Sequence, residues 1–161
     1  MSRIGQTMAR LRQEKRVGLI AYLTVGYPDV EATLRLVPAL AAGGADMVEL
    51  GVPFSDPLAD GTTIQRASHH ALQQGVTPAL CLDVVRQLRA RGLAIPLLLM
   101  GYYNSILAYG IDEFARDAAG AGADGLNEVD LPPEEAAGVR TACAGRGGDL
   151  IYLLAPTSSD E

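Results

Sequence analysis

From residue 18 onward, the sequence alternates short apolar runs with longer amphipathic segments, and this alternation restricts the folds that the chain can adopt. The apolar runs are "GLIAYLTV", "DMVELGV", "IPLLLMGYY", "DGLNEVDLP" and "DLIYLLAPT". Near-continuous apolar character is typical of strands in a parallel sheet that helices cover. The sequence therefore predicts an α/β fold with five strands, built from βα units.

The intervening segments carry the start and stop signals of helices. A helix is expected from Thr62 to Gln73, and in the next one Thr77 is the cap, Pro78 lies in the first turn and Gly92 follows the end. Asp29 can cap another helix. Further helices are expected over "DEFARDAAGAG", from Pro133 to about Cys143, and near the N-terminus, where Ile4, Met8 and Leu11 recur at helical spacing.

Length and charge narrow the class of protein. With 161 residues, the chain has the length of one domain, which we expect to span residues 1–161. The net charge of −6 argues against a nucleic-acid partner, since phosphate binding relies on clustered Lys and Arg. No apolar run reaches the roughly 18 residues that a membrane span requires. Cys81 and Cys143 have neither disulfide nor metal spacing, so we expect reduced thiols and a cytoplasmic protein.

A weak internal repeat links two of the predicted strands. "GADMVEL" and "GADGLNE" begin 78 residues apart, the length of two βα units of about 39 residues each. The repeat aligns Glu49 with Asn127, so both side chains should point the same way. Because Val48 and Leu50 suit the helix-covered exterior, alternation directs Glu49 to the interior, near the C-terminal end of its strand.

Three acids mark this strand end and the loop behind it, "ELGVPFSDPLADG". Active sites of parallel βα folds lie where the C-terminal ends of the strands converge, and a carboxylate there can give and take a proton. Glu49 and Asp60 are therefore candidate catalytic acids. Structural alternatives stay open: Glu49 can bind a backbone donor, and Asp60 before Gly61, like Asp56 before Pro57, can serve a turn or a helix cap.

The stretch "ELGVPFSDPLADGTTIQRAS" resembles the signature of the tryptophan synthase α subunit family. The resemblance continues through "YLTVGYPD", "GVTPALCLDVVRQLR", "MGYYNSILAYG" and "DLPPEEA". It covers essentially the whole chain, but only about the first three fifths of a family chain, whose barrel takes about 250 residues. It implies a parallel (β/α) barrel of the TIM type, here incomplete, with about five of eight βα units and an N-terminal helix.

The resemblance also implies an activity: a carbon–carbon lyase of tryptophan biosynthesis that cleaves indole-3-glycerol phosphate to indole and glyceraldehyde 3-phosphate. By resemblance, Glu49 is the acid and base, and Asp60 balances the charge that develops at the indole nitrogen. No metal or organic cofactor is implied. The residues that would line the indole pocket are Tyr22, Ile64, Met100, Tyr102, Val129 and Leu153. The family forms an α2β2 tetramer, and the residues that would face the β subunit are Pro53, Phe54, Asp56 and Asn104.

Two departures from the family pattern bear on function. Asn127 and Glu128 stand where the family runs apolar, and alternation turns Asn127 to the pocket and Glu128 to the layer between strand and helices. A charge in that layer costs several kcal/mol unless it is paired or reaches solvent. The family's phosphate-binding turns have no counterpart here, so the resemblance implies impaired turnover by these 161 residues alone.

Two alternatives to the lyase function stay open. One is a non-catalytic partial barrel that binds the β subunit or another chain, and the other is a different phosphate-handling barrel such as an epimerase.

Overall fold

The computed structural model describes residues 1–154, 156 and 158, and its centre is one parallel sheet. The strand order follows the sequence, β1-β2-β3-β4-β5, as expected for consecutive βα units. The bounds of the strands are β1 (Ile20–Thr24), β2 (Met47–Gly51), β3 (Leu97–Gly101), β4 (Gly125–Glu128) and β5 (Asp149–Ile151). The last strand was predicted to continue to residue 157, but it ends at Ile151, and residues 155 and 157 lie outside the described ones.

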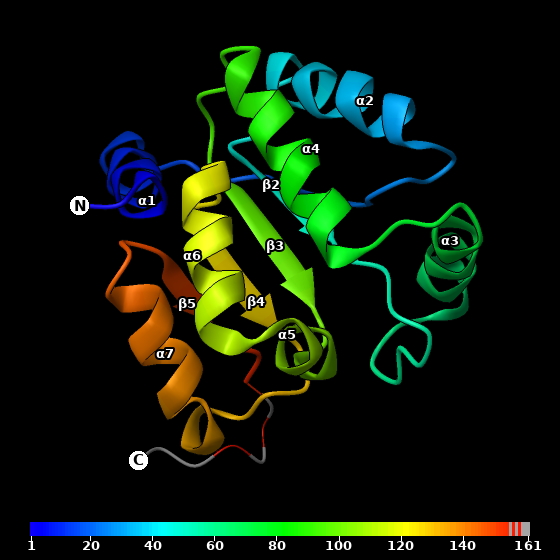
Figure 1. Ribbon diagram of the computed structural model, residues 1–161. Helices are drawn as coiled ribbons and strands as arrows, with labels where there is room; N and C mark the ends of the chain where they lie inside the picture. Colours follow the sequence, from blue (N-terminus) through cyan, green and yellow to red (C-terminus); the bar gives the residue numbers. More distant parts are fainter. Residues whose placement is uncertain (155, 157, 159–161) are drawn as a thin grey trace.

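Helices cover one face of this sheet. Figure 1 shows α2, α4, α6 and α7 side by side along it, while α1 lies toward the start of β3 and α5 beyond its arrowhead. The helices are α1 (Arg3–Glu14), α2 (Val30–Ala42), α3 (Thr62–Gln73), α4 (Pro78–Ala90), α5 (Tyr103–Tyr109), α6 (Ile111–Ala121), the 3-10 turn η1 (Pro133–Glu135) and α7 (Ala137–Ala144). In the described part of the chain, none of them is long and apolar enough to cross a membrane.

The predicted caps are confirmed. The Asp29 carboxylate accepts a hydrogen bond from the amide of Ala32 at 2.6 Å, and the Thr77 hydroxyl accepts one from Leu80 at 3.2 Å. These bonds satisfy amide groups that the first turn of a helix leaves unpaired. Gly92 takes a left-handed φ of +85° after α4, as its position at the helix end predicts.

Helix α5 differs from the sequence-based prediction, which continued the third strand to Tyr103. The strand ends at Gly101, and α5 begins at Tyr103. The amide of Tyr103 donates to the carboxylate of Asp130, 2.8 Å away on the loop after β4. This helix start is therefore capped from a distant part of the chain, and local propensity, which favours aromatic residues in strands, does not show it.

The hydrophobic core lies between the sheet and the helices. Val48 and Leu50 of β2 are fully buried there with Leu97 and Leu99 of β3. Val85 of α4 belongs to the same cluster. Because alternate residues of a strand point to opposite faces, the residues between them, Glu49 among them, face the interior of the incomplete barrel.

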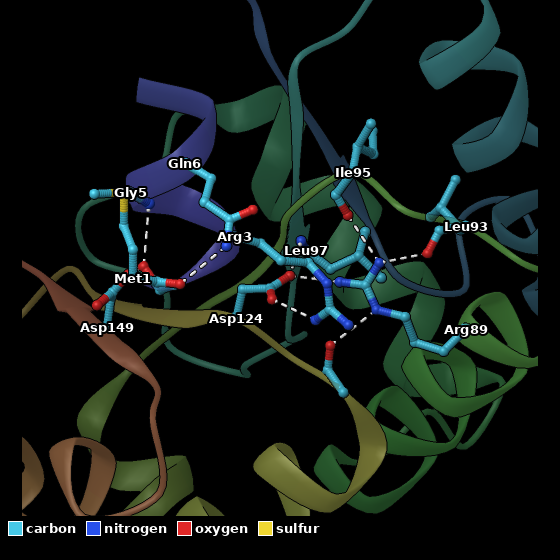
Figure 2. Close-up of polar contacts among 12 residues, drawn as sticks. Met1, Arg3, Gly5, Gln6, Arg89, Leu93, Ile95, Leu97, Asp124 and Asp149 are labelled. Atoms are coloured by element: carbon cyan, nitrogen blue, oxygen red, sulfur yellow. Dashed lines mark hydrogen bonds and ion pairs between the residues drawn. The ribbon is translucent and has the colours of Figure 1, made fainter. Parts of the chain in front are cut away.

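Two buried aspartates hold the N-terminal ends of the strands, and both belong to the Gly-Ala-Asp repeat. Asp124 accepts hydrogen bonds from Arg3 at 2.7 Å, from Arg89 at 2.5 Å and from the amide of Leu97 at 2.8 Å (Figure 2). Its own amide donates to the carbonyl of Leu97. Asp124 therefore binds the backbone at the start of β3 through both its main chain and its side chain, and joins α1 to α4.

Asp46 repeats this arrangement at the N-terminal ends of β1 and β2. Its carboxylate accepts from the amide of Leu19 at 2.9 Å and its amide donates to the carbonyl of Leu19. The guanidinium groups of Arg16 and Arg10 bind the same carboxylate. The Arg16 hydrogen bonds and the Leu19 amide hold the pKa of Asp46 at about 2, so it stays ionised across the physiological range.

Replacing Asp124 with Ala should strongly destabilise the fold. The substitution leaves the largely buried Arg89 and the Leu97 amide without their acceptor, and breaking a buried ion pair costs about 3 to 5 kcal/mol. Urea denaturation followed by circular dichroism measures this change. As a control, Asp83→Ala removes a surface ion pair with Arg86 and should change the free energy of unfolding by less than about 1 kcal/mol. Equal effects of the two substitutions would contradict this role of Asp124.

Candidate active site

Glu49 lies on the interior face of β2, as the sequence predicts, but at the middle residue of the strand and not at its C-terminal end. It pairs in register with Tyr22 of β1 and Leu98 of β3. The side chain is half-buried, and its Oε1 accepts a hydrogen bond from Nδ2 of Asn127 at 2.8 Å. This contact confirms the expectation, drawn from the internal repeat, that Glu49 and Asn127 point the same way. The structural alternative of a backbone donor for Glu49 finds no bond among the described residues.

Tyr22 brings the two candidate acids into one site. Its hydroxyl lies over Gly51, where any side chain would collide with the ring, and forms a 3.3 Å hydrogen bond with Thr24. Burial raises the pKa of Tyr22, and the negative charges of Asp60 and Glu49 act in the same direction. Both carboxylates are therefore close enough to the Tyr22 hydroxyl to influence its ionisation.

Asp60 lies in the loop between β2 and α3, and its side chain does not cap that helix. Gly61 occupies the cap position, and no side chain caps the first turn. Burial raises the pKa of Asp60, and the hydroxyl of Tyr102 opposes part of this rise. The Tyr102 hydroxyl also accepts from the amide of Ala59 at 3.0 Å, and burial raises the pKa of Tyr102 to about 12. A neutral phenol thus holds the loop that carries Asp60.

A hollow of about 260 Å³ lies beside this loop. The rings of Phe54 and Tyr102 stack at its wall, with centroids 5.2 Å apart. Three of the four residues assigned to the partner interface by resemblance line it, and the fourth, Pro53, is buried next to them in the chain. The lining residues are Phe54, Asp56, Leu58, Ala59, Tyr102, Asn104 and Asp130.

The other predicted pocket residues differ in how far they are enclosed. Met100 of β3 pairs in register with Asn127, and Val129 donates its amide to the carbonyl of Gly101, so both belong to the same region of the sheet. Both are half-buried, as is Ile64 in the first turn of α3. Leu153 lies beyond β5 with 61% of its surface exposed.

Glu128 is buried on the opposite face of β4 from Asn127. Only 2% of its surface is exposed, and neither carboxylate oxygen has a hydrogen-bond partner among the described residues. One of these oxygens, Oε1, lies beside Gly101 of β3. Burial, reinforced by the charge of Asp130, raises the pKa of Glu128 to about 8. Its negative charge in turn adds to the burial that raises the pKa of the Cys143 thiol.

Asp46, Asp124 and the Asp130 cap have structural roles that the sequence-based interpretation missed. Both copies of the internal repeat contain Gly-Ala-Asp, and in each copy the aspartate lies one residue before its strand. Among residues 1–154, 156 and 158, no three His, Cys, Asp or Glu side chains gather as a metal site requires.

The fold and the site together define a class of protein: an incomplete parallel βα barrel of the TIM type, with an acidic site at the C-terminal ends of its strands. The chain belongs to the tryptophan synthase alpha chain family, whose sequence model matches residues 8–161. Both the sequence resemblance and the expected fold class are thereby confirmed.

Individual relatives agree with this assignment. The chain is 55% identical to the tryptophan synthase alpha chain of Roseiflexus sp. (strain RS-1) over 161 residues, which is 100% of this chain and 62% of the relative. It is 49% identical to the tryptophan synthase of Saccharomyces cerevisiae over 98% of this chain and 22% of that one. The crystal structure of the alpha subunit from Legionella pneumophila superimposes with a TM-score of 0.96 at 46% identity, covering 99% of this chain and 61% of that chain. The chain therefore spans about three fifths of the length of these alpha chains.

Glu128 should make the stability of the protein depend on pH. Its pKa is raised in the folded state, so the folded form binds a proton that the unfolded form releases above its ordinary value of 4.5. The free energy of unfolding should therefore fall as the pH rises from about 4.5 to about 8, by up to about 5 kcal/mol. Glu128→Leu should flatten this dependence and stabilise the protein at pH 8.

Urea denaturation across this pH range measures the effect. Glu31→Gln, which changes an exposed acid in the first turn of α2, serves as the control and should leave the slope in place. A Glu128→Leu variant with an unchanged pH dependence would contradict the assignment.

Proposed function

We propose that this chain carries the acid–base half of an indole-3-glycerol phosphate lyase, which releases indole and glyceraldehyde 3-phosphate in tryptophan biosynthesis. The observation that supports it best is the position of Glu49. It projects into the barrel interior from the middle of β2, and Asp60 follows on the next loop, where its charge, like that of Glu49, adds to the burial that raises the pKa of Tyr22. Family membership makes this chemistry the natural one for the pair.

Glu49 is the proton donor and acceptor in this proposal. Protonation of indole carbon 3 leaves an iminium cation at the ring nitrogen. When the side-chain hydroxyl then loses its proton, an aldehyde forms, the carbon–carbon bond breaks, and its electron pair restores the indole ring. One carboxyl group in a half-buried position can serve both proton transfers, since it can give the first proton and take the second.

Asp60 supplies a fixed negative charge opposite the ring nitrogen. The iminium cation exists only after protonation, so a carboxylate held there stabilises the transition state more than the bound substrate. The pKa of Asp60 is raised by burial, and the Tyr102 hydroxyl favours its ionised form. In this proposal, two tyrosines and four apolar side chains line the pocket for the indole ring: Tyr22, Tyr102, Ile64, Met100, Val129 and Leu153.

We also propose that the protein is cytoplasmic and forms a single domain. Cys81 and Cys143 are buried free thiols, which fits a reducing compartment such as the cytoplasm. We treat residues 1–161 as one partial-barrel domain, and the proposed chemistry needs no metal or organic cofactor.

Glu49→Gln should lower the rate of indole release from indole-3-glycerol phosphate by about 10² to 10⁴-fold, because glutamine cannot transfer the proton. Release is measured with this chain and with a chimera that continues into the remaining part of the Roseiflexus relative. Activity should be higher in the chimera, which has the full length of the family. Asp83→Asn, on the surface of α4, is the control and should retain the parent rate. Equal rates with Glu and Gln at position 49, or no release even by the chimera, would overturn the proposal.

We further propose that the hollow beside the β2–α3 loop binds a tryptophan synthase β subunit, as the α2β2 assembly of the family suggests. Its stacked aromatic wall offers apolar contact area, and two carboxylates, Asp56 and Asp130, give it a negative rim. Leu58, at the same hollow, has 94% of its surface exposed. Exposing this apolar side chain to water is unfavourable, and a bound partner would bury it.

Reversing the charge at this rim should weaken the complex. Asp56→Lys is expected to raise the dissociation constant for a β subunit by about tenfold, mainly through slower association, because rim charges steer the encounter. Surface plasmon resonance with an immobilised β subunit measures both rates. Asp83→Lys makes the same charge change on α4 and should leave binding unaltered. If both variants bind like the parent chain, the hollow is not the docking site.

A further inference from the structure

The hydrogen bond between Asn127 and Glu49 joins two strands that are not neighbours. Glu49 is on β2 and Asn127 on β4, with β3 between them. In the register of the sheet, Glu49 lies opposite Leu98, and Leu98 lies opposite Gly125. Asn127 is therefore two residues nearer the C-terminal ends than the level of Glu49. The glutamate extends toward this end of the sheet and meets the amide there.

The bond uses only one side of each group. Oε1 of Glu49 accepts from Nδ2 of Asn127 at 2.8 Å, which leaves Oε2 available for other partners. Oδ1 of Asn127 is buried and accepts no hydrogen bond from the described residues. A buried acceptor without a donor costs about 1 to 3 kcal/mol, so the amide oxygen is the unexplained part of the pair.

A primary amide has a property that explains this oxygen, because it carries a donor and an acceptor on one rotatable group. Toward an ionised Glu49, Nδ2 donates, as observed. Toward a protonated Glu49, a half-turn of the amide would present Oδ1, which accepts the carboxylic acid's O–H. Asn127 can therefore stay bonded to Glu49 in both protonation states. An apolar side chain at this position could bond to neither.

We propose that Asn127 is a positioning residue for Glu49. The side-chain amide of Asn127 rotates by half a turn as Glu49 gains and loses its proton. This role deepens the proposed lyase function and rests on it for its catalytic consequence. The amide keeps the carboxyl group in one orientation: Nδ2 donates to Oε1 when Glu49 is ionised, and Oδ1 accepts the O–H of that oxygen when Glu49 is protonated. The geometry that carries the proposal is the bond across β3 together with the orphaned Oδ1.

The first test follows the amide itself and needs no turnover. In ¹H–¹⁵N spectra of the ¹⁵N-labelled chain, the side-chain NH₂ pair of Asn127 should shift with pH as Glu49 ionises. In Glu49→Gln, where position 49 no longer titrates, this shift should disappear. The side-chain NH₂ pair of Gln73, on the exposed surface of α3, should behave the same in both proteins. An Asn127 amide that shifts identically with and without Glu49, or does not shift at all, overturns the proposal.

The second test separates positioning from binding. Asn127→Leu keeps an apolar surface for the indole ring and should leave KM within about threefold. It should lower kcat by about 10 to 100-fold, the equivalent of one hydrogen bond to a charged group. Asn127→Gln, which retains both amide atoms, should recover part of kcat, and Gln73→Leu should have no effect.

The two tests distinguish the failure of this inference from the failure of the lyase proposal. In one outcome, the Asn127 amide shifts depend on Glu49, but neither the protein nor the chimera releases indole. This result would support the Asn127–Glu49 pairing and reject the lyase function. Indole release that depends on Glu49 but is unchanged in Asn127→Leu would sustain the lyase and reject the positioning role. Because Glu49→Gln leaves Asn127 in place, the first test does not depend on the leucine variant folding.

Discussion

The parallel register of the strands is the constraint on which the candidate site depends, and two buried aspartates anchor two of the four strand pairs. Asp46 binds the backbone of Leu19 through its amide and carboxylate, and Asp124 binds Leu97 in the same way. Each aspartate lies three residues before a polar side chain of the interior, Glu49 in one case and Asn127 in the other. The hydrogen bonds of these aspartates therefore tie β2 to β1 and β4 to β3 at the N-terminal ends of the strands. The proposed catalytic groups thus lie away from the buried aspartates that hold the N-terminal ends of the strands, the separation that is typical of βα barrels.

Much of this arrangement could be predicted from the sequence because it follows from local signals. Alternation along β2 correctly turned Glu49 inward, since the apolar Val48 and Leu50 have only one helix-covered face to occupy. The caps at Asp29 and Thr77 were also correct, because a cap and its helix are adjacent in the chain. The internal repeat carried information that strand alternation and helix caps do not, because it is not local. It related two strands that are far apart in sequence and so predicted a shared direction for Glu49 and Asn127.

What could not be predicted depends on contacts between distant segments. Asp130 caps α5 from the loop after β4, and no local pattern near Tyr103 reveals this. Tyr102 illustrates the same limit: the resemblance placed it in a pocket, but its bond to the Ala59 amide depends on how the β2–α3 loop folds back. Alternation sets the side of a strand on which a residue lies. It leaves open which partner is within hydrogen-bonding distance, and that partner determines what the residue does.

Asn127 and Glu128 show how one strand gives opposite outcomes to two adjacent polar residues. Asn127 faces the interior, where Glu49 supplies an acceptor, so its Nδ2 donates a charge-assisted hydrogen bond. Glu128 faces the helix layer, where the described residues supply no donor, and burial keeps it protonated near neutral pH. Its neutral form is the cheaper of two unfavourable states, because a buried charge without a partner costs more than a buried carboxylic acid. A polar residue in a βα strand therefore serves the site only on the interior face, and on the other face it lowers the stability on which that site depends.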